Sequence, residues 1–117
     1  MNKGWIKLHR KIMDSQLYKE KRVFSKSEAF IELVMLAKHK DEDVLHGYQV
    51  VKLKRGQLLT SKTKLAKRWG WSRPKLDRFF SLLESLHMAL QQTTQQYTIV
   101  TICNYNTYQG EHPDDNT

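Results

Sequence analysis

The sequence predicts a single α+β domain, and two hydrophobic patterns in its second half indicate how that domain is arranged. A chain of 117 residues is long enough for one modest core. Between Lys62 and Leu86, apolar residues recur at spacings of three and four, which is typical of amphipathic helices. After Leu86 the period falls to two, which predicts a β-hairpin. Paired helices followed by two strands predict a winged helix-turn-helix, with three main helices, a small β-hairpin wing and an N-terminal extension.

The turn between the paired helices is centred on Gly70 and Ser72. Gly70 is suited to end the first helix, about Lys62–Trp69, because glycine enters the left-handed region without a Cβ penalty. Ser72 is a natural cap for the second helix, about Ser72–Leu86, and Pro74 fits its first turn, where a backbone N–H has no helical partner. A helix end and a helix start this close predict a steep crossing.

The two helices are expected to have distinct inner and outer faces. The core-facing positions share apolar side chains at helical spacing: Leu65, Ala66, Trp69, Leu76, Phe79, Phe80, Leu83 and Leu86. The aromatic members are interpreted as packing side chains, because they fall on the inner face. The outer faces carry Lys64 and Lys67 on the first helix and Arg78, Ser81 and Ser85 on the second.

Positive charge is concentrated around these helices. From Lys52 to Arg78 there are ten Lys or Arg and one acid, which gives 10 − 1 = +9, whereas the whole chain sums to +8. No Lys or Arg follows Arg78. A solvated surface would mix its signs, so this block indicates a surface for a polyanion and favours nucleic-acid binding.

The N-terminal part of the chain has patterns that fit both a strand and a helix. Residues 4–18 alternate for part of their length but also place apolar side chains at helical spacing. We expect an extended start through about Ile12, a short helical turn to Tyr18, and a polar loop over Lys19–Lys26.

A third helix is expected to begin at Ser25 or Ser27, with Glu28 near its positive N-terminal dipole. Little but Glu32 is polar in it, and a helix that is apolar on nearly all sides is buried on more than one face. The N-terminal segment or another subunit would cover the second face. Phe30–Ala37 is therefore a candidate homo-oligomer interface.

Two hairpins complete the predicted fold. The first turns at His46-Gly47, and the strand residues expected around it are Tyr48, Val50, Val51, Leu53 and Leu58. The second, the predicted wing, has a loop over Gln91–Gln96 between alternating strand residues, which are Met88, Leu90, Tyr97, Ile99, Thr101 and Cys103. The wing tip contains only Thr and Gln, so it is a poor probe of the minor groove.

Composition and motifs argue against several other classes of protein. Cys103 is alone, so neither an internal disulfide nor a cysteine metal cluster is expected. The five histidines are scattered, and no catalytic spacing, phosphate loop or metal motif occurs, so neither an enzyme nor a bound cofactor is predicted. No apolar run is long enough for a signal peptide or a bilayer span, and we expect a cytoplasmic protein with no membrane partner.

Four segments of the chain resemble a known family: Gly4–Ile12, Lys54–Gln57, Trp69–Arg73 and Thr101–Tyr105. Together they look like the N-terminal winged-helix domain of phage and prophage replication initiators, the replisome organisers related to bacterial DnaD-type primosome proteins. The resemblance covers about residues 4–108. The Gly-x-Ser-Arg piece alone is shared with many winged-helix regulators, including the GntR type.

The resemblance implies a winged-helix domain over residues 1–108, binding of origin or replication-fork DNA, and often self-association. A second domain typically follows in such proteins and helps to recruit a helicase or its loader. Such a domain would begin about where the given sequence ends, and we expect residues 109–117 to be a polar linker or tail. Where such domains usually turn through a glycine this chain has His87, which is expected to take a positive φ.

The predicted DNA-binding residues lie on the paired helices, the second of which would enter the major groove as a recognition helix. The family motif carries Ser72 and Arg73 to the DNA-facing start of that helix, where free N–H groups favour a phosphate. Mid-helix Arg78 is the best candidate to read a guanine edge, and cations of the first helix are better suited to phosphates. The full predicted set is Ser72, Arg73, Lys75, Arg78, Ser81, Lys62, Lys64, Lys67 and Arg68.

Two alternatives to a replication-initiation domain remain open. A transcriptional regulator with the same fold predicts a dimer, a palindromic operator and usually an effector domain. An oligomerisation or protein-interaction module without DNA binding is favoured by the apolar helix, whereas the basic block argues against it.

Overall fold

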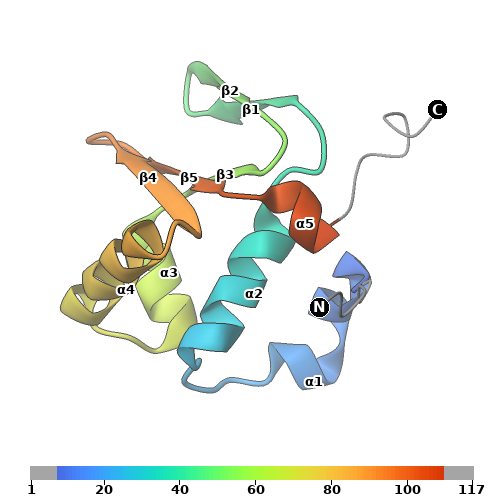
Figure 1. The fold of residues 1–117 in the computed structure, drawn as a ribbon, viewed down its shortest axis with the longest axis vertical. Helices are drawn as coiled ribbons and strands as arrows, with labels where there is room; N and C mark the ends of the chain where they lie inside the picture. Colours follow the sequence, from blue (N-terminus) through green and yellow to red (C-terminus); the bar gives the residue numbers. More distant parts are fainter. Residues whose placement is uncertain (1–7, 110–117) are drawn as a thin grey trace.

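A computed structural model describes residues 8–109, in which helices and small antiparallel sheets form an α+β domain. The predicted fold class is confirmed at this level. The elements in order are the 3-10 helix η1 (Arg10–Asp14), α1 (Gln16–Lys19), α2 (Lys26–Leu36), β1 (Glu42–His46), β2 (Gln49–Leu53), β3 (Gln57–Thr60), α3 (Lys62–Trp69), α4 (Arg73–Ser85), β4 (Ala89–Thr93), β5 (Thr98–Ile102) and α5 (Tyr105–Gln109). Helices α2, α3 and α4 lie beneath the sheet of β3, β4 and β5, and the β1–β2 hairpin stands above it (Figure 1).

The N-terminal segment is helical from Arg10 onward, so the prediction of an extended chain through Ile12 is wrong for these residues. The guanidinium of Arg10 donates to the carbonyl oxygens of Met35 (2.7 Å) and Ala37 (3.1 Å) and to the hydroxyl of Tyr105 (2.6 Å). The last carbonyls of a helix have no intrahelical partner, so Arg10 satisfies the C-terminal end of α2. The predicted helical turn to Tyr18 is confirmed by α1, and the part of the prediction before Leu8 lies outside the described residues.

Helix α2 begins with a capping box. Ser25 Oγ accepts from the backbone N–H of Glu28 (3.2 Å), and Glu28 Oε1 accepts from the backbone N–H of Ser25 (2.9 Å). Two N–H groups at this helix start are satisfied reciprocally, which fixes the start of α2 at the first of the two predicted serines. Just before it, Phe24 is buried although a polar loop was predicted there.

The buried face of α2 is narrower than its composition predicts. Ile31 and Leu36 are 46% and 40% exposed, whereas Glu32 is only 4% exposed. The Glu32 carboxylate is buried because three side chains on α1 and α3 donate hydrogen bonds to it, which are Tyr18, Arg68 and Trp69. The predicted oligomer range, Phe30–Ala37, is thus mostly covered by the rest of the same chain.

The first hairpin pairs β1 with β2, with Leu45 opposite Val50. It turns through Gly47 and Tyr48, one residue later than predicted, and Tyr48 is fully exposed instead of lying in a strand. Since side chains alternate between the faces of a strand, Val51 and Leu53 point inward while Leu45 and Val50 point away from the core.

The second sheet is antiparallel, with strand order β3-β5-β4. Its buried residues on β5 are Thr98, Val100 and Ile102, so the predicted alternation of Tyr97, Ile99 and Thr101 identified the outer face. Both sets contain β-branched residues, and only the packing of central strand β5 over the helices distinguishes them. Strand β4 also runs to Thr93, which makes the loop shorter than predicted.

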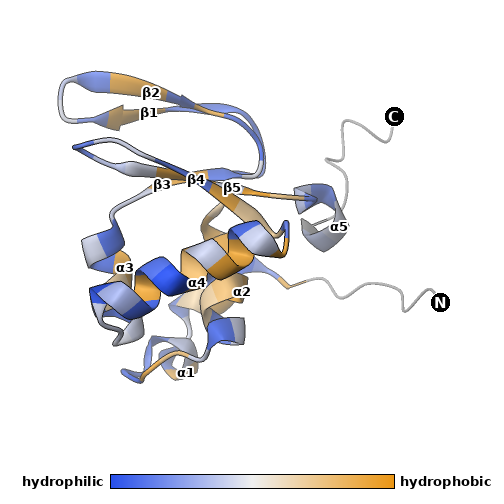
Figure 2. Cartoon of the chain, turned by 60° about the vertical axis from the view of Figure 1, so that its left-hand side comes forward, coloured by the Kyte–Doolittle hydropathy of each residue, from blue (hydrophilic) through white to orange (hydrophobic). Residues whose placement is uncertain are grey.

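The core lies between the three main helices and this sheet. Its largest fully buried side chains are Trp69, Phe24, Phe80, Leu33, Leu53, Leu76 and Val100. Figure 2 shows hydrophobic residues of α2 and α4 gathered where these helices meet. Each such side chain contributes roughly 1.5–3 kcal/mol when it leaves water. Most of these residues lie on the apolar helix faces that the spacing of the sequence predicted.

The chain after α4 and the chain after β5 differ from the prediction. Leu86 was expected in the core but is 54% exposed, because it lies beyond the end of α4. The turn that follows uses His87 with φ of 57°, as predicted for this position. Asn104 takes φ of 56° and leads into α5, where Tyr105 is buried. The packed part of the chain therefore extends beyond Asn104, where the polar composition predicted a loose segment.

No helix in residues 8–109 is long and apolar enough to cross a membrane.

Candidate nucleic-acid interface

The turn between α3 and α4 is built by its own sequence and anchored to the segment before α2. Gly70 takes φ of 72°, and a Cβ at this position would meet Val23 Cγ2 at 3.2 Å. Beside it, the indole of Trp71 donates to the carbonyl oxygen of Phe24 (2.9 Å). Ser72 Oγ accepts from the backbone N–H of Lys75 (3.3 Å), which confirms Ser72 as the cap of α4.

The start and the outer face of α4 are open to solvent. Ser72, Arg73, Arg78 and Ser81 are all exposed, in agreement with their predicted placement. Arg73 donates to Thr63 Oγ1 (3.2 Å), which ties the first turn of α4 to α3. Because the first N–H groups of a helix have no backbone acceptor, this end of α4 presents donors and a partial positive charge to an anion.

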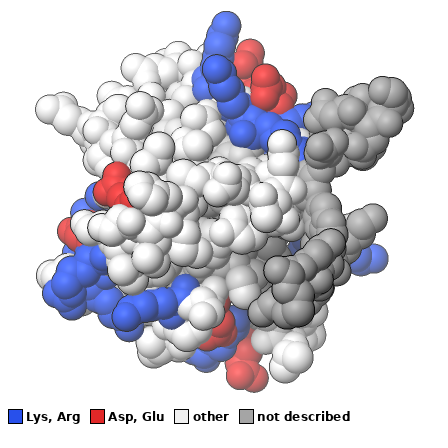
Figure 3. All heavy atoms as spheres, in the orientation of Figure 1, with Lys and Arg blue, Asp and Glu red and all other residues white. Residues whose placement is uncertain are grey.

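Helix α3 adds exposed cations beside that end. Lys64 and Lys67 point to solvent, while Leu65, Ala66 and Trp69 are buried, as their spacing predicted. Figure 3 shows Lys and Arg gathered over the lower left of the molecule, where α3 and α4 lie in Figure 1. A second group of cations lies at the top, beside acidic side chains.

Two cations of the predicted set form ion pairs within the chain. The guanidinium of Arg68 donates to Glu32 Oε1 through Nε and Nη2, both at 3.2 Å, and stacks over the rings of Tyr18 and Phe24. The ammonium of Lys62 lies 3.5 Å from Asp77 Oδ1 and joins α3 to α4. Both side chains were predicted to face DNA. The spacing of charges in the sequence does not distinguish a cation that is free in solvent from one that pairs with an acid distant in sequence.

The fold also divides the basic block in two. Lys52, Lys54 and Arg55 lie on β2 and the loop after it, and the Arg55 guanidinium stacks over Tyr105 at 4.9 Å and donates to Asn106 (2.8 Å). Seven of the ten cations lie on α3 and α4, and 7 − 2 = 5 of these form no ion pair within residues 8–109. The five are Lys64, Lys67, Arg73, Lys75 and Arg78, and they define what we call the α3–α4 cationic surface.

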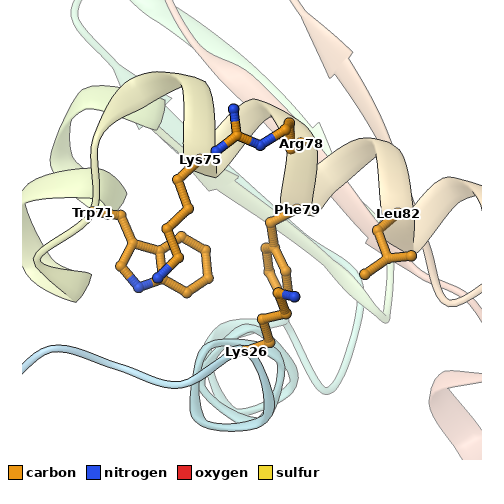
Figure 4. Close-up of a pocket in the computed structure, with 6 residues that line it drawn as sticks. All are labelled: Lys26, Trp71, Lys75, Arg78, Phe79 and Leu82. Carbon is orange, nitrogen blue, oxygen red and sulfur yellow. The ribbon is translucent and has the colours of Figure 1, made fainter.

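One further cation borders this surface and was not predicted as part of it. Lys26, the first residue of α2, lines an open hollow of about 330 Å³ whose other lining residues are Trp71, Lys75, Arg78, Phe79 and Leu82 (Figure 4). The ammonium of Lys75 lies over the Trp71 ring, 4.6 Å from its centroid. Only the packing of α2 against α4 brings Lys26 here, so no local pattern in the sequence marks it.

The β4–β5 hairpin ends in an uncharged tip. Thr94 Oγ1 accepts from the backbone N–H groups of Gln96 and Tyr97, both at 3.1 Å, which closes the turn. Tyr97 also packs edge-on against His46, with ring centroids 5.2 Å apart, so the two hairpins support each other. The residues of the tip carry only neutral hydrogen-bonding groups.

Within residues 8–109, no group of three or more His, Cys, Asp or Glu is placed to hold a metal ion. No protein-family model, curated protein or solved structure matches this chain.

Proposed function

We propose that this chain is a winged-helix DNA-binding domain that inserts α4 into the major groove. The observation that carries the proposal is the α3–α4 cationic surface, which surrounds the open, capped start of α4. Two crossing helices followed by the β4–β5 hairpin fit the arrangement of a winged helix-turn-helix. A cationic surface centred on a helix start fits a polyanion that runs past it.

The residues divide by the contacts they are suited to make. Arg78 is exposed in the middle of α4, where a guanidinium can reach the N7 and O6 atoms of guanine. Lys64 and Lys67 on α3, together with Arg73, are suited to phosphates, which position the protein without reading the sequence. Ser81, one turn after Arg78, offers a hydroxyl on the same outer face.

We further propose that this DNA binding serves replication initiation of the phage type. Two segments of the family resemblance that are distant in sequence meet in space: Ile102 donates its N–H to the carbonyl oxygen of Gly56 (2.8 Å). A Cβ on Gly56 would lie 3.0 Å from Cβ of Tyr105. This mutual packing supports treating the segments as one pattern. In this role the protein would act with a helicase or helicase loader recruited by a further domain.

A protein-interaction role is the second candidate, because the β1–β2 hairpin exposes apolar side chains. Leu45 and Val50, paired across the strands, are 72% and 62% exposed, and Tyr48 lies fully exposed at the turn. Apolar residues grouped in this way are typical of interaction surfaces.

Self-association would also be required of a transcriptional regulator that binds a palindromic operator.

Selection of bound oligonucleotides from a random duplex pool tests the proposal. A replication-origin reader is expected to enrich a motif, and labelled duplexes that carry it should bind the Arg78→Ala variant more weakly than the wild type. The selected motif shows whether the site is an inverted repeat or a direct array, and sedimentation of the complexes shows whether a dimer is bound to it. No retention of duplex or forked DNA at low salt would contradict DNA binding altogether.

A further inference from the structure

The hollow between α2 and α4 combines three cations with an apolar floor. Lys26 approaches from the start of α2, whereas Lys75 and Arg78 come from successive turns of α4 (Figure 4). The six lining residues include no acid, and none of the three cations pairs with a carboxylate in the described part of the chain. An anion that entered the hollow would meet positive charge from two separate helices.

The apolar part of the hollow extends along α4. Phe79 and Trp71 are nearly buried and form the base, while Leu82 is 40% exposed. Leu86, one turn further along the chain, is exposed as well. A phosphate would use the cations but would leave this leucine surface in water, so a ligand that also covers Leu82 fits better.

A nucleobase is a poor occupant because no aromatic face is free to stack on. The ring of Trp71 is only 7% exposed, and Lys75 covers it. Trp71 also makes T-shaped contacts with the rings of Trp69 and Phe79, with ring centroids 5.0 Å apart in both pairs. Recognition of single-stranded nucleic acid relies on exposed aromatic platforms, and the hollow does not offer one.

We infer that this hollow binds an acidic peptide segment that carries one apolar side chain. The apolar side chain would cover Leu82 and the edge of Phe79, while flanking carboxylates would contact Lys26, Lys75 and Arg78. Charge complementarity selects this partner over a basic or neutral peptide. The inference goes beyond DNA binding, and because Lys75 and Arg78 border both surfaces, the peptide and duplex DNA would compete.

Fluorescence anisotropy with two labelled synthetic peptides tests this inference on the full chain. One has the sequence Asp-Asp-Leu-Asp-Asp and the other Asp-Asp-Ser-Asp-Asp. The variants Leu82→Ser and Lys26→Ala are each expected to weaken binding of the leucine peptide by roughly fivefold or more, which corresponds to about 1 kcal/mol. Leu90→Ser, an exposed leucine on β4, and Lys64→Ala, an exposed lysine on α3, are the matched controls and should leave peptide binding unchanged.

Duplex binding by the same variants separates this inference from the proposed DNA-binding function. Lys64→Ala should weaken DNA binding, whereas Leu82→Ser and Lys26→Ala should not. If the serine peptide bound as tightly as the leucine peptide, charge alone would explain binding and the inference would be overturned. The absence of saturable peptide binding would overturn it as well. Loss of DNA affinity without loss of peptide affinity in Leu82→Ser would assign the hollow to nucleic acid instead.

Discussion

The indole nitrogen of Trp69 donates to Oε2 of Glu32 at 2.7 Å inside the core. The same carboxylate accepts from the hydroxyl of Tyr18 (2.6 Å) and from Arg68. One buried acid on α2 thus joins α1 and α3. Burial, together with the hydrogen bond to Glu32 and the negative charge of Glu32, raises the pKa of Tyr18 well above its usual value.

Glu32→Ala is expected to lower the free energy of unfolding by roughly 2 kcal/mol or more, because it leaves buried donors without an acceptor. Arg68 is partly exposed and keeps some hydration, so the expected minimum loss lies below the roughly 3–5 kcal/mol typical of a broken buried ion pair. Urea denaturation measures the change, with Glu20→Ala on the surface as the control. Equal midpoints for the two variants would contradict a structural role for Glu32.

Arg68 and its neighbour Lys67 are expected to behave differently in DNA binding. Lys67→Ala should reduce the slope of log affinity against log salt by roughly 0.9, since one phosphate contact is lost. Arg68→Ala should leave that slope unchanged but should lower thermal stability, because Glu32 loses its cation. Fluorescence anisotropy across a salt series gives both slopes. A reduced slope for Arg68→Ala in folded protein would return Arg68 to the DNA-binding set.

The capping box of α2 predicts a dependence of stability on pH. The backbone N–H of Ser25 and the side chain of Arg22 hold the pKa of Glu28 below its usual value of 4.5. A carboxylate whose pKa is depressed by folding stabilises the native state above its unfolded-state pKa, and this contribution is lost as pH falls through the folded value. The urea midpoint of Glu28→Gln should therefore lie below the wild-type midpoint at pH 7 and converge with it in acid.

Denaturation series at several pH values, with Glu84→Gln on α4 for comparison, measure this convergence. A constant difference between Glu28→Gln and wild type from pH 7 down to pH 3 would show that ionisation of Glu28 does not contribute.

Gly56→Ala is expected to destabilise the fold more than Gly47→Ala. Both glycines have positive φ, 86° and 59°, so each substitution carries a backbone cost of about 1 kcal/mol. Only at Gly56 would the new Cβ also lie 3.0 Å from the Cβ of Tyr105, whereas Gly47 has open space around it. The difference in melting temperature between the two variants measures the effect of the contact with Tyr105. Equal decreases would show that α5 moves aside without loss of stability.

Local chemistry made the paired helices predictable from sequence. The bounds of α3 agree with the predicted Lys62–Trp69, and the Gly70 and Ser72 conformations follow from residue type. Helical period, a left-handed glycine and a serine cap act within a few residues of one another, so a linear pattern contains them. The α+β class followed from the change of period after α4.

The tertiary structure alone decided which charges are free. It paired Arg68 with Glu32, 36 residues away, and brought Lys26 beside α4 to complete a hollow. It also chose the inward face of β5 and buried Tyr105 under Gly56. Burial makes an unpaired charge or donor costly, so the partner of each polar side chain depends on the whole packed core and not on its neighbours in sequence.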